Sequence, residues 1–99
     1  MGVDSFHTRA AGPTLQAAFE AARNTAAREY GTSPYAGTVY NKTEIELFDE
    51  PARTEREASF RASEPMRTHH FDTSSPAGAL PLTTDGATSA WLLFGYVVI

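Results

Sequence analysis

The chain ends in a long apolar run, WLLFGYVVI, in which no side chain carries a charge. A membrane-spanning helix needs about 20 apolar residues, and this run is too short even when it is extended back to Ala90. We therefore expect no membrane partner. A continuous apolar run rich in β-branched and aromatic residues predicts a strand over residues 90–99 that is covered on both faces. One helix layer covers one face, so we expect the 64–89 segment or a partner subunit to cover the other.

The composition indicates one globular domain over residues 1–99, because 41% of its residues are hydrophobic and the length allows one core. The formal charge is −4 with no basic stripe, so we expect no nucleic-acid partner. The absence of cysteine excludes disulfides and cysteine-ligated metals. The N-terminus lacks the basic and apolar regions of a signal peptide, and we expect a cytoplasmic protein.

Residues 13–30 predict an amphipathic helix. Pro13 suits the first helical position, and Gly31 suits the left-handed position that follows a last turn. Apolar residues recur between them at steps of three and four: Leu15, Ala18, Phe19, Ala22, Ala26 and Tyr30.

Three further segments have strand patterns. Residues 3–10 alternate and stop at a Gly-Pro pair, which predicts a first strand. Residues 38–48 predict either one strand or two short ones, with Ile45 and Leu47 inside in both cases. Residues 79–82, which include a proline, predict a short edge strand.

Residues 52–63 are compatible with two structures, of which we favour a helix. Thr54 and Glu57 have the spacing of a capping box, and oppositely charged residues lie four positions before and after Glu57. Apolar residues also alternate here as they would in a strand: Ala58, Phe60 and Ala62.

These elements together predict a small α+β protein, a two-layer sandwich with a mainly antiparallel sheet, a clear helix over 13–30 and a second helix over 52–63. A ferredoxin-like β-α-β-β-α-β order is compatible with that string, although the long 64–89 segment fits it poorly.

The sharpest chemical candidate combines all three histidines with one aspartate: His7, His69, His70 and Asp72. Imidazole and carboxylate groups are the usual ligands of zinc and non-haem iron, and a histidine beside an aspartate is typical of general-base catalysis. Adjacent histidines, however, point in different directions on a strand or a helix. We interpret this segment as a polar loop and expect no catalytic residue, metal or cofactor, with these four residues as the alternative ligand set.

Tyrosines surround the loop that follows the first helix: Tyr30, Tyr35 and Tyr40. Exposed tyrosines are favoured anchors in protein interfaces because the ring offers a large apolar area with a polar tip. Together with Trp91, which opens the terminal apolar run, they are the candidate interaction residues.

Several segments resemble small proteins encoded by actinobacterial phages: MGVDSFHTR, GPTLQAAFEAA, YAGTVYNK, PAGALPL and the terminal apolar strand with its tryptophan. The resemblance covers most of the chain and implies a short strand that leads into an alanine-rich helix. It brings no known activity. Where that pattern has a histidine- and glycine-rich stretch before the Tyr-x-Gly-Thr element, this chain has YGTSP.

We therefore expect a non-enzymatic phage-type accessory protein that binds a host or phage protein, or itself through the C-terminal strand. One alternative is a small metal- or histidine-dependent hydrolytic enzyme that uses His7, His69, His70 and Asp72. A second alternative is a minor structural component of the virion.

Overall fold

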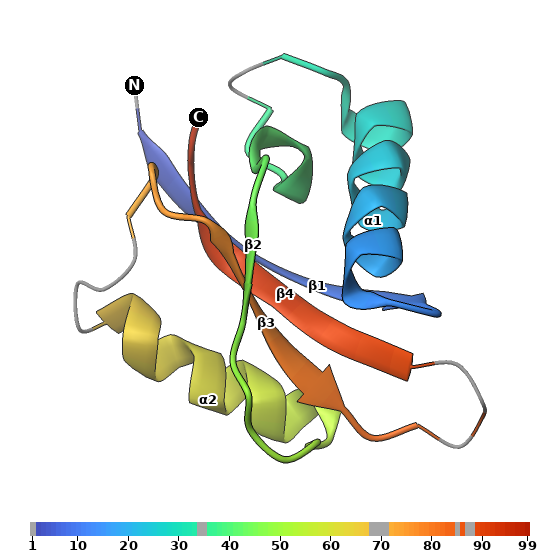
Figure 1. The fold of residues 1–99 in the computed structure, drawn as a ribbon. Helices are drawn as coiled ribbons and strands as arrows, with labels where there is room; N and C mark the ends of the chain where they lie inside the picture. The colour runs from blue at the N-terminus through green and yellow to red at the C-terminus, as the bar shows by residue number, and fades with distance from the viewer. Residues whose placement is uncertain (1, 34–35, 68–71, 85, 87–88) are drawn as a thin grey trace.

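The computed structural model describes residues 2–33, 36–67, 72–84, 86 and 89–99 and consists of strands and helices (Figure 1). In chain order they are β1 (Val3–Gly12), α1 (Leu15–Tyr30), a 3-10 turn η1 (Val39–Asn41), β2 (Ile45–Leu47), α2 (Glu55–Arg67), β3 (Ala77–Leu82) and β4 (Ser89–Val98). The described strands form one sheet in the order β1-β4-β3-β2. The α+β class and both helices are thus confirmed.

The C-terminal strand β4 lies inside this sheet. It pairs antiparallel with β1 along its whole length, from Ser89 opposite Gly12 to Val98 opposite Val3, and antiparallel with β3 on its other side. β2 pairs with β3 in parallel. The two outer strands are therefore β1 and β2, and the order of elements, β-α-β-α-β-β, differs from the ferredoxin-like order.

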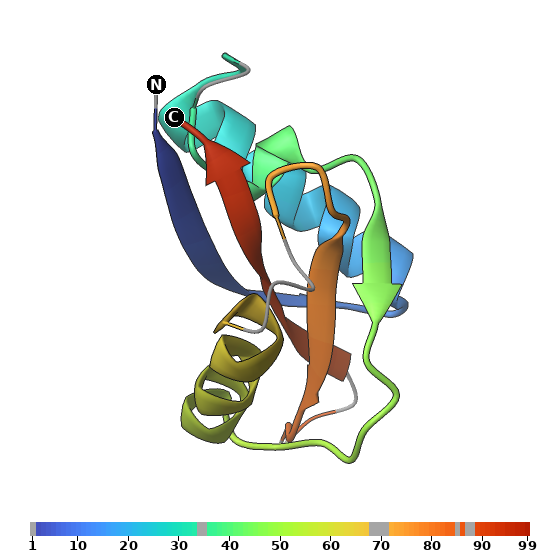
Figure 2. The same ribbon diagram turned by 90° about the vertical axis from the view of Figure 1, so that its left-hand side faces the viewer.

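The two helices lie on opposite faces of the sheet, with α2 in front of it and α1 behind it in Figure 2. The chain crosses from β1 to β2 through α1 and then returns to β3 through α2. The two crossover connections run across the sheet in opposite directions. They can therefore have the same handedness only when their helices lie on opposite faces of the sheet. The sheet therefore has a partial helix layer on each side, where the sequence predicted one layer.

α1 ends where its sequence predicts, and Thr14 caps its N-terminus. The Thr14 hydroxyl accepts a hydrogen bond from the Ala17 N–H at 3.1 Å, and Gly31 follows the last turn with a φ of 94°. Ala18 and Phe19 are fully buried against the sheet. Pro13 precedes the cap, so the helix starts two residues later than expected.

α2 is a helix, and a reciprocal capping box between Thr54 and Glu57 stabilises its N-terminus. The Thr54 hydroxyl accepts from the Glu57 N–H at 3.2 Å, and the Thr54 N–H donates to the Glu57 carboxylate at 3.1 Å. Ala58 and Ala62 are fully buried, whereas Phe60 between them is 84% exposed, so the alternation does not reflect a strand. The helix also runs beyond residue 63 to Arg67.

Side chains of β4 alternate between two cores. Leu93 and Val97 belong to the core under α1, and Leu92 and Phe94 belong to the core under α2. The second face of β4 is therefore covered by a helix of the same chain. Among the described residues of the expected 64–89 cover, 64–67 contribute as the last turn of α2, and the described part of the chain covers this face without a partner subunit.

Two strand expectations were wrong in detail. Residues 38–48 form η1 and a three-residue β2, and Leu47 is 48% exposed because β2 is an outer strand beyond most of both cores. The segment 79–82 is part of the inner strand β3. Pro81 is tolerated there because its nitrogen faces the β2 side, where β2 has already ended, and its carbonyl accepts from the Arg53 N–H at 3.2 Å.

None of the described helices has the length and apolar character needed to cross a membrane.

We predict that Gly78→Ala destabilises the fold. A Cβ at residue 78 would lie 2.7 Å from Phe94 Cε2, inside contact distance of a fully buried ring. Thermal or urea unfolding should show a loss of about 1–3 kcal/mol. Gly86→Ala is the matched control, because a Cβ there meets no atom within 4 Å. Equal stabilities of the two variants would contradict this packing.

Candidate functional site

β1 presents a free edge on the side away from β4. At the end of the ladder, Gly2 and Ile99 exchange two backbone hydrogen bonds of 3.0 Å each. Because hydrogen-bonded and non-hydrogen-bonded pairs alternate along an antiparallel ladder, the odd-numbered residues of β1 direct their N–H and C=O groups outward. These residues are Val3, Ser5, His7, Arg9 and Ala11, and all five are exposed.

One outward group is already occupied. The Asp4 carboxylate accepts from the Ser5 N–H at 2.9 Å and so closes the edge near the N-terminus. Among the residues that the structure describes, none forms a hydrogen bond with the outward backbone groups of His7, Arg9 or Ala11. The open part of the edge therefore runs from His7 to Ala11.

The first face beside this edge is an apolar groove, which we call the alanine groove. It has a volume of about 400 Å³ and lies between β1, α1 and residues 37–39. Its apolar lining includes Phe6, Ala10, Ala18, Ala22, Ala26 and Val39. Alanine side chains of α1 fill little of the space between helix and strand, which leaves this groove. Tyr30 stands at one end of the groove and is 67% exposed.

The second face beside the edge is more polar, and we call it the arginine groove. Because α2 packs on β3 and β4, it leaves the odd-numbered side chains of β1 uncovered. A broad groove of about 980 Å³ brings His7 together with residues of α2, among them Arg56, Phe60 and Arg67. Partial burial lowers the pKa of His7 below its ordinary value, so the ring is neutral at pH 7.

An extended segment can use all of these features at once. Its backbone would bond to the outward groups of β1, and its side chains would alternate between the two grooves. Sequence reasoning identified β1 as a strand but did not identify its edge, because strand order cannot be read from periodicity.

The predicted metal ligands are not gathered by the described part of the structure. His7 lies in the arginine groove, and Asp72 lies in the loop before β3. His69 and His70 lie outside the described residues. Within residues 2–33, 36–67, 72–84, 86 and 89–99, no three histidine or carboxylate side chains group as metal ligands.

Asp72 instead organises its own loop. Its carboxylate accepts from the Ser74 hydroxyl at 2.6 Å, from the Ser74 N–H at 2.8 Å and from the Ser75 hydroxyl at 3.2 Å. These hydrogen bonds, those of Ser74 above all, lower the pKa of Asp72. The two serine hydroxyls are thereby donors to a carboxylate, which is a loop-forming arrangement.

Lys42, which sequence reasoning missed, is only 4% exposed and ties this loop to the turn after α1. Its Nζ donates to the carbonyls of Asp72, Thr73 and Ser75 at 3.5, 3.2 and 2.7 Å. Burial lowers the pKa of Lys42, and the Asp72 charge partly offsets this effect. The three N–H groups of its ammonium thus have three carbonyl acceptors, and Lys42 has a structural role that links the loop before β3 to the turn after α1. No local signal could have revealed it, since its acceptors are about 30 residues away.

The candidate interaction residues lie in different surroundings. Tyr30 is at the alanine groove, as described above. Tyr40 is partly buried: the Arg23 guanidinium lies 5.1 Å from its ring centroid and donates to its carbonyl. Trp91 is partly buried against the core under α1. Tyr35 lies outside the described residues.

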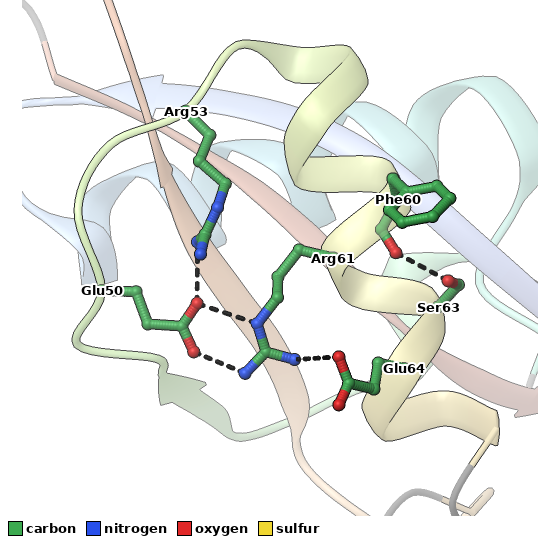
Figure 3. Close-up of polar contacts among 6 residues, drawn as sticks. All are labelled: Glu50, Arg53, Phe60, Arg61, Ser63 and Glu64. Atoms are coloured by element: carbon green, nitrogen blue, oxygen red, sulfur yellow. Dashed lines mark hydrogen bonds and ion pairs between the residues drawn. The ribbon is translucent and has the colours of Figure 1, made fainter.

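A cluster of charges fixes the chain between β2 and α2 (Figure 3). Glu50 accepts from Arg53 at 2.7 Å and from two nitrogens of Arg61 at 3.0 and 2.6 Å. The Arg61 guanidinium lies 5.9 Å from the Phe48 ring centroid, and this ring meets Phe94 edge-on at 5.5 Å. The cluster therefore holds α2 on the core.

Comparison with known proteins found no family model, no curated protein and no solved structure that matches this chain. The function is therefore inferred from the geometry of the chain itself.

We predict a pH-dependent effect of Glu50→Gln. The hydrogen bond from Arg61, with a smaller contribution from Arg53, lowers the pKa of Glu50 in the folded state. Its stabilisation is therefore complete above the unfolded pKa near 4.5 and is lost as the pH falls through the lower folded value. Urea unfolding at pH 7 should show a loss of about 1 kcal/mol that shrinks in acid.

The control for this measurement is Glu46→Gln, at an exposed residue of β2 that has no ion pair among the described residues. A difference between Glu50→Gln and the native protein that stays constant from neutral to acid pH would contradict the assigned role of the carboxylate.

Proposed function

We propose that this domain is a non-enzymatic accessory module that captures an extended segment of another protein by strand addition to β1. The observation that carries the proposal is the free backbone edge from His7 to Ala11, which lies between two grooves. Strand addition uses the main chain for affinity and alternate side-chain pockets for specificity.

The expected contributions are of ordinary size. Each backbone hydrogen bond that the guest forms adds about 0.5–1.5 kcal/mol net, so the few bonds available between His7 and Ala11 give weak binding alone. Apolar burial in the alanine groove must add to this, at roughly 25 cal/mol per Å². The grooves are therefore as necessary as the edge.

Features of β1 oppose the pairing of two copies through the same edge. The Asp4 carboxylate closes one end of it, and Arg9 places a charge that has no ion-pair partner among the described residues near its middle. Charged side chains and shortened edges are the usual means by which proteins prevent edge-to-edge association. A foreign segment is thus the favoured guest. The proposal keeps the accessory binding role inferred from the sequence and moves the contact from the C-terminal strand to β1.

The test compares His7→Pro with His7→Ala. Proline removes an outward N–H without removing a bond to β4, whereas alanine keeps that N–H and removes only the side chain. Decapeptides selected from a displayed random library on the native domain should bind His7→Pro about tenfold or more weakly and bind His7→Ala nearly normally. Hydrogen exchange at the Arg9 and Ala11 amides should slow in the complex.

A second pair of variants tests the alanine groove and guards against misfolding of the proline variant. Ala21→Trp fills the groove from an exposed residue of α1, and Asn24→Trp places the same ring on α1 outside it. Only the first should block binding. The proposal is wrong if no peptide is selected, or if the selected peptides bind a folded His7→Pro and Ala21→Trp as they bind the native domain.

A further inference from the structure

The two grooves beside β1 differ in charge, and this difference specifies the guest. The inference rests on the strand addition proposed above. In a guest strand, successive side chains point to opposite faces, so one set would enter the alanine groove and the other set would enter the arginine groove. The type of side chain that the guest needs can therefore be inferred separately for each groove.

The set that enters the alanine groove must be apolar. Phe6 and Ala10 of β1 are buried on this face, and the groove continues over Ala18, Ala22 and Ala26 of α1. Polar residues also line the groove (Thr8, Arg9, Thr25, Glu29 and Thr38), but a polar guest side chain over the apolar surface of Phe6 and Ala10 would lose water without a partner, which is costly. Side chains of moderate size suit the groove of about 400 Å³.

The set that enters the arginine groove meets positive charge. Arg56 and Arg67 of α2 line this groove, whereas Arg9 of β1 is a lining residue of the alanine groove. In the described part of the chain, none of these three guanidinium groups has an ion-pair partner. His7, also in the groove, adds no charge at neutral pH because its pKa is lowered.

The acidic residues of the arginine groove are already engaged. Glu57 accepts hydrogen bonds from the backbone and hydroxyl of Thr54, and Glu64 lies 3.6 Å from Arg61. The remaining cationic residues of the groove, Arg53 and Arg61, bind Glu50. The positive charge of this groove that stays uncompensated is therefore that of Arg56 and Arg67.

Phe60 supports a docking role for the same side of α2. It lies between Arg56 and Arg67 in the sequence, lines the arginine groove and is 84% exposed. In Figure 3 its ring points away from the cluster around Glu50. An exposed ring beside two cations without ion-pair partners suits a guest side chain that combines an apolar stem with an anionic end.

We infer that the partner segment is an extended peptide in which apolar residues alternate with acidic residues, glutamate above all. The acidic set pairs with Arg56 and Arg67, and the apolar set enters the alanine groove. The net charge of −4 opposes a polyanion such as nucleic acid, whereas a short peptide with a few carboxylates meets only the local field.

The chain itself contains one such alternation, EIEL at residues 44–47. In this structure three of those residues form β2, and Ile45 packs against the core under α1. A second copy would have to give up that pairing to act as the guest. The inferred guest is therefore a different protein, and self-association is an outcome that would contradict it.

The test uses three synthetic decapeptides measured by calorimetry or fluorescence anisotropy. The first alternates valine with glutamate, the second has lysine in place of glutamate, and the third has serine in place of valine. We expect the first to bind at least about tenfold more tightly than the other two, and to bind more weakly as salt is raised.

A charge-reversed variant makes the test specific. Arg56→Glu combined with Arg67→Glu should invert the preference so that the valine–lysine peptide binds more tightly than the valine–glutamate peptide. Arg28→Glu is the matched control, because Arg28 is an exposed arginine on α1 outside both grooves, and it should leave the preference unchanged.

The outcomes separate this inference from the proposal on which it rests. Equal binding of the glutamate and lysine peptides, or selected library peptides without acidic alternation that still depend on the His7 amide, would overturn the charge inference and leave strand addition standing. If His7→Pro weakens the binding of no peptide, both the charge inference and the strand-addition proposal are overturned. A domain that dimerises through residues 44–47 would overturn the choice of a foreign guest.

Discussion

The structure depends on one constraint, which is that β4 must be buried on every side. Its apolar side chains alternate between two cores, and both of its edges are paired. Gly95 in the middle of this strand allows close packing, because a Cβ there would lie 3.2 Å from the Phe6 ring and 3.5 Å from the Lys42 stem. The strand thereby requires a helix on each face and a strand on each edge, and the rest of the chain supplies them.

The free edge of β1 is a by-product of how that requirement is met. α2 is a helix of 13 residues that packs on β3 and β4 and stops short of β1. β1, the outer strand on one side of the sheet, therefore keeps an uncovered face and an unpaired edge. On the other face, the alanines that let α1 approach the sheet closely also leave the alanine groove beside β1. The proposed binding site therefore needs no element beyond those that form and cover the sheet.

The polar residues divide into those that hold the fold and those that face outward. Lys42, Asp72 and Glu50 have their hydrogen-bonding capacity taken up by loops and helices of the chain. Arg56 and Arg67 have no ion-pair partner among the described residues and line one groove. The proposed site accordingly relies on two arginines that belong to no recognisable motif, whereas the Asp72 carboxylate is engaged in its own loop.

The sequence by itself determined the features that depend on local interactions. The cap at Thr14, the capping box at Thr54 and the apolar stripe of α1 each involve residues within a few positions of one another, so their patterns predicted two helices and an α+β fold. The terminal apolar run likewise predicted a strand with two covered faces. Only the tertiary structure decided which segment covered the second face, where Lys42 found its acceptors and which strand kept a free edge. Those outcomes depend on contacts between residues far apart in the chain, and strand order sets which of them form.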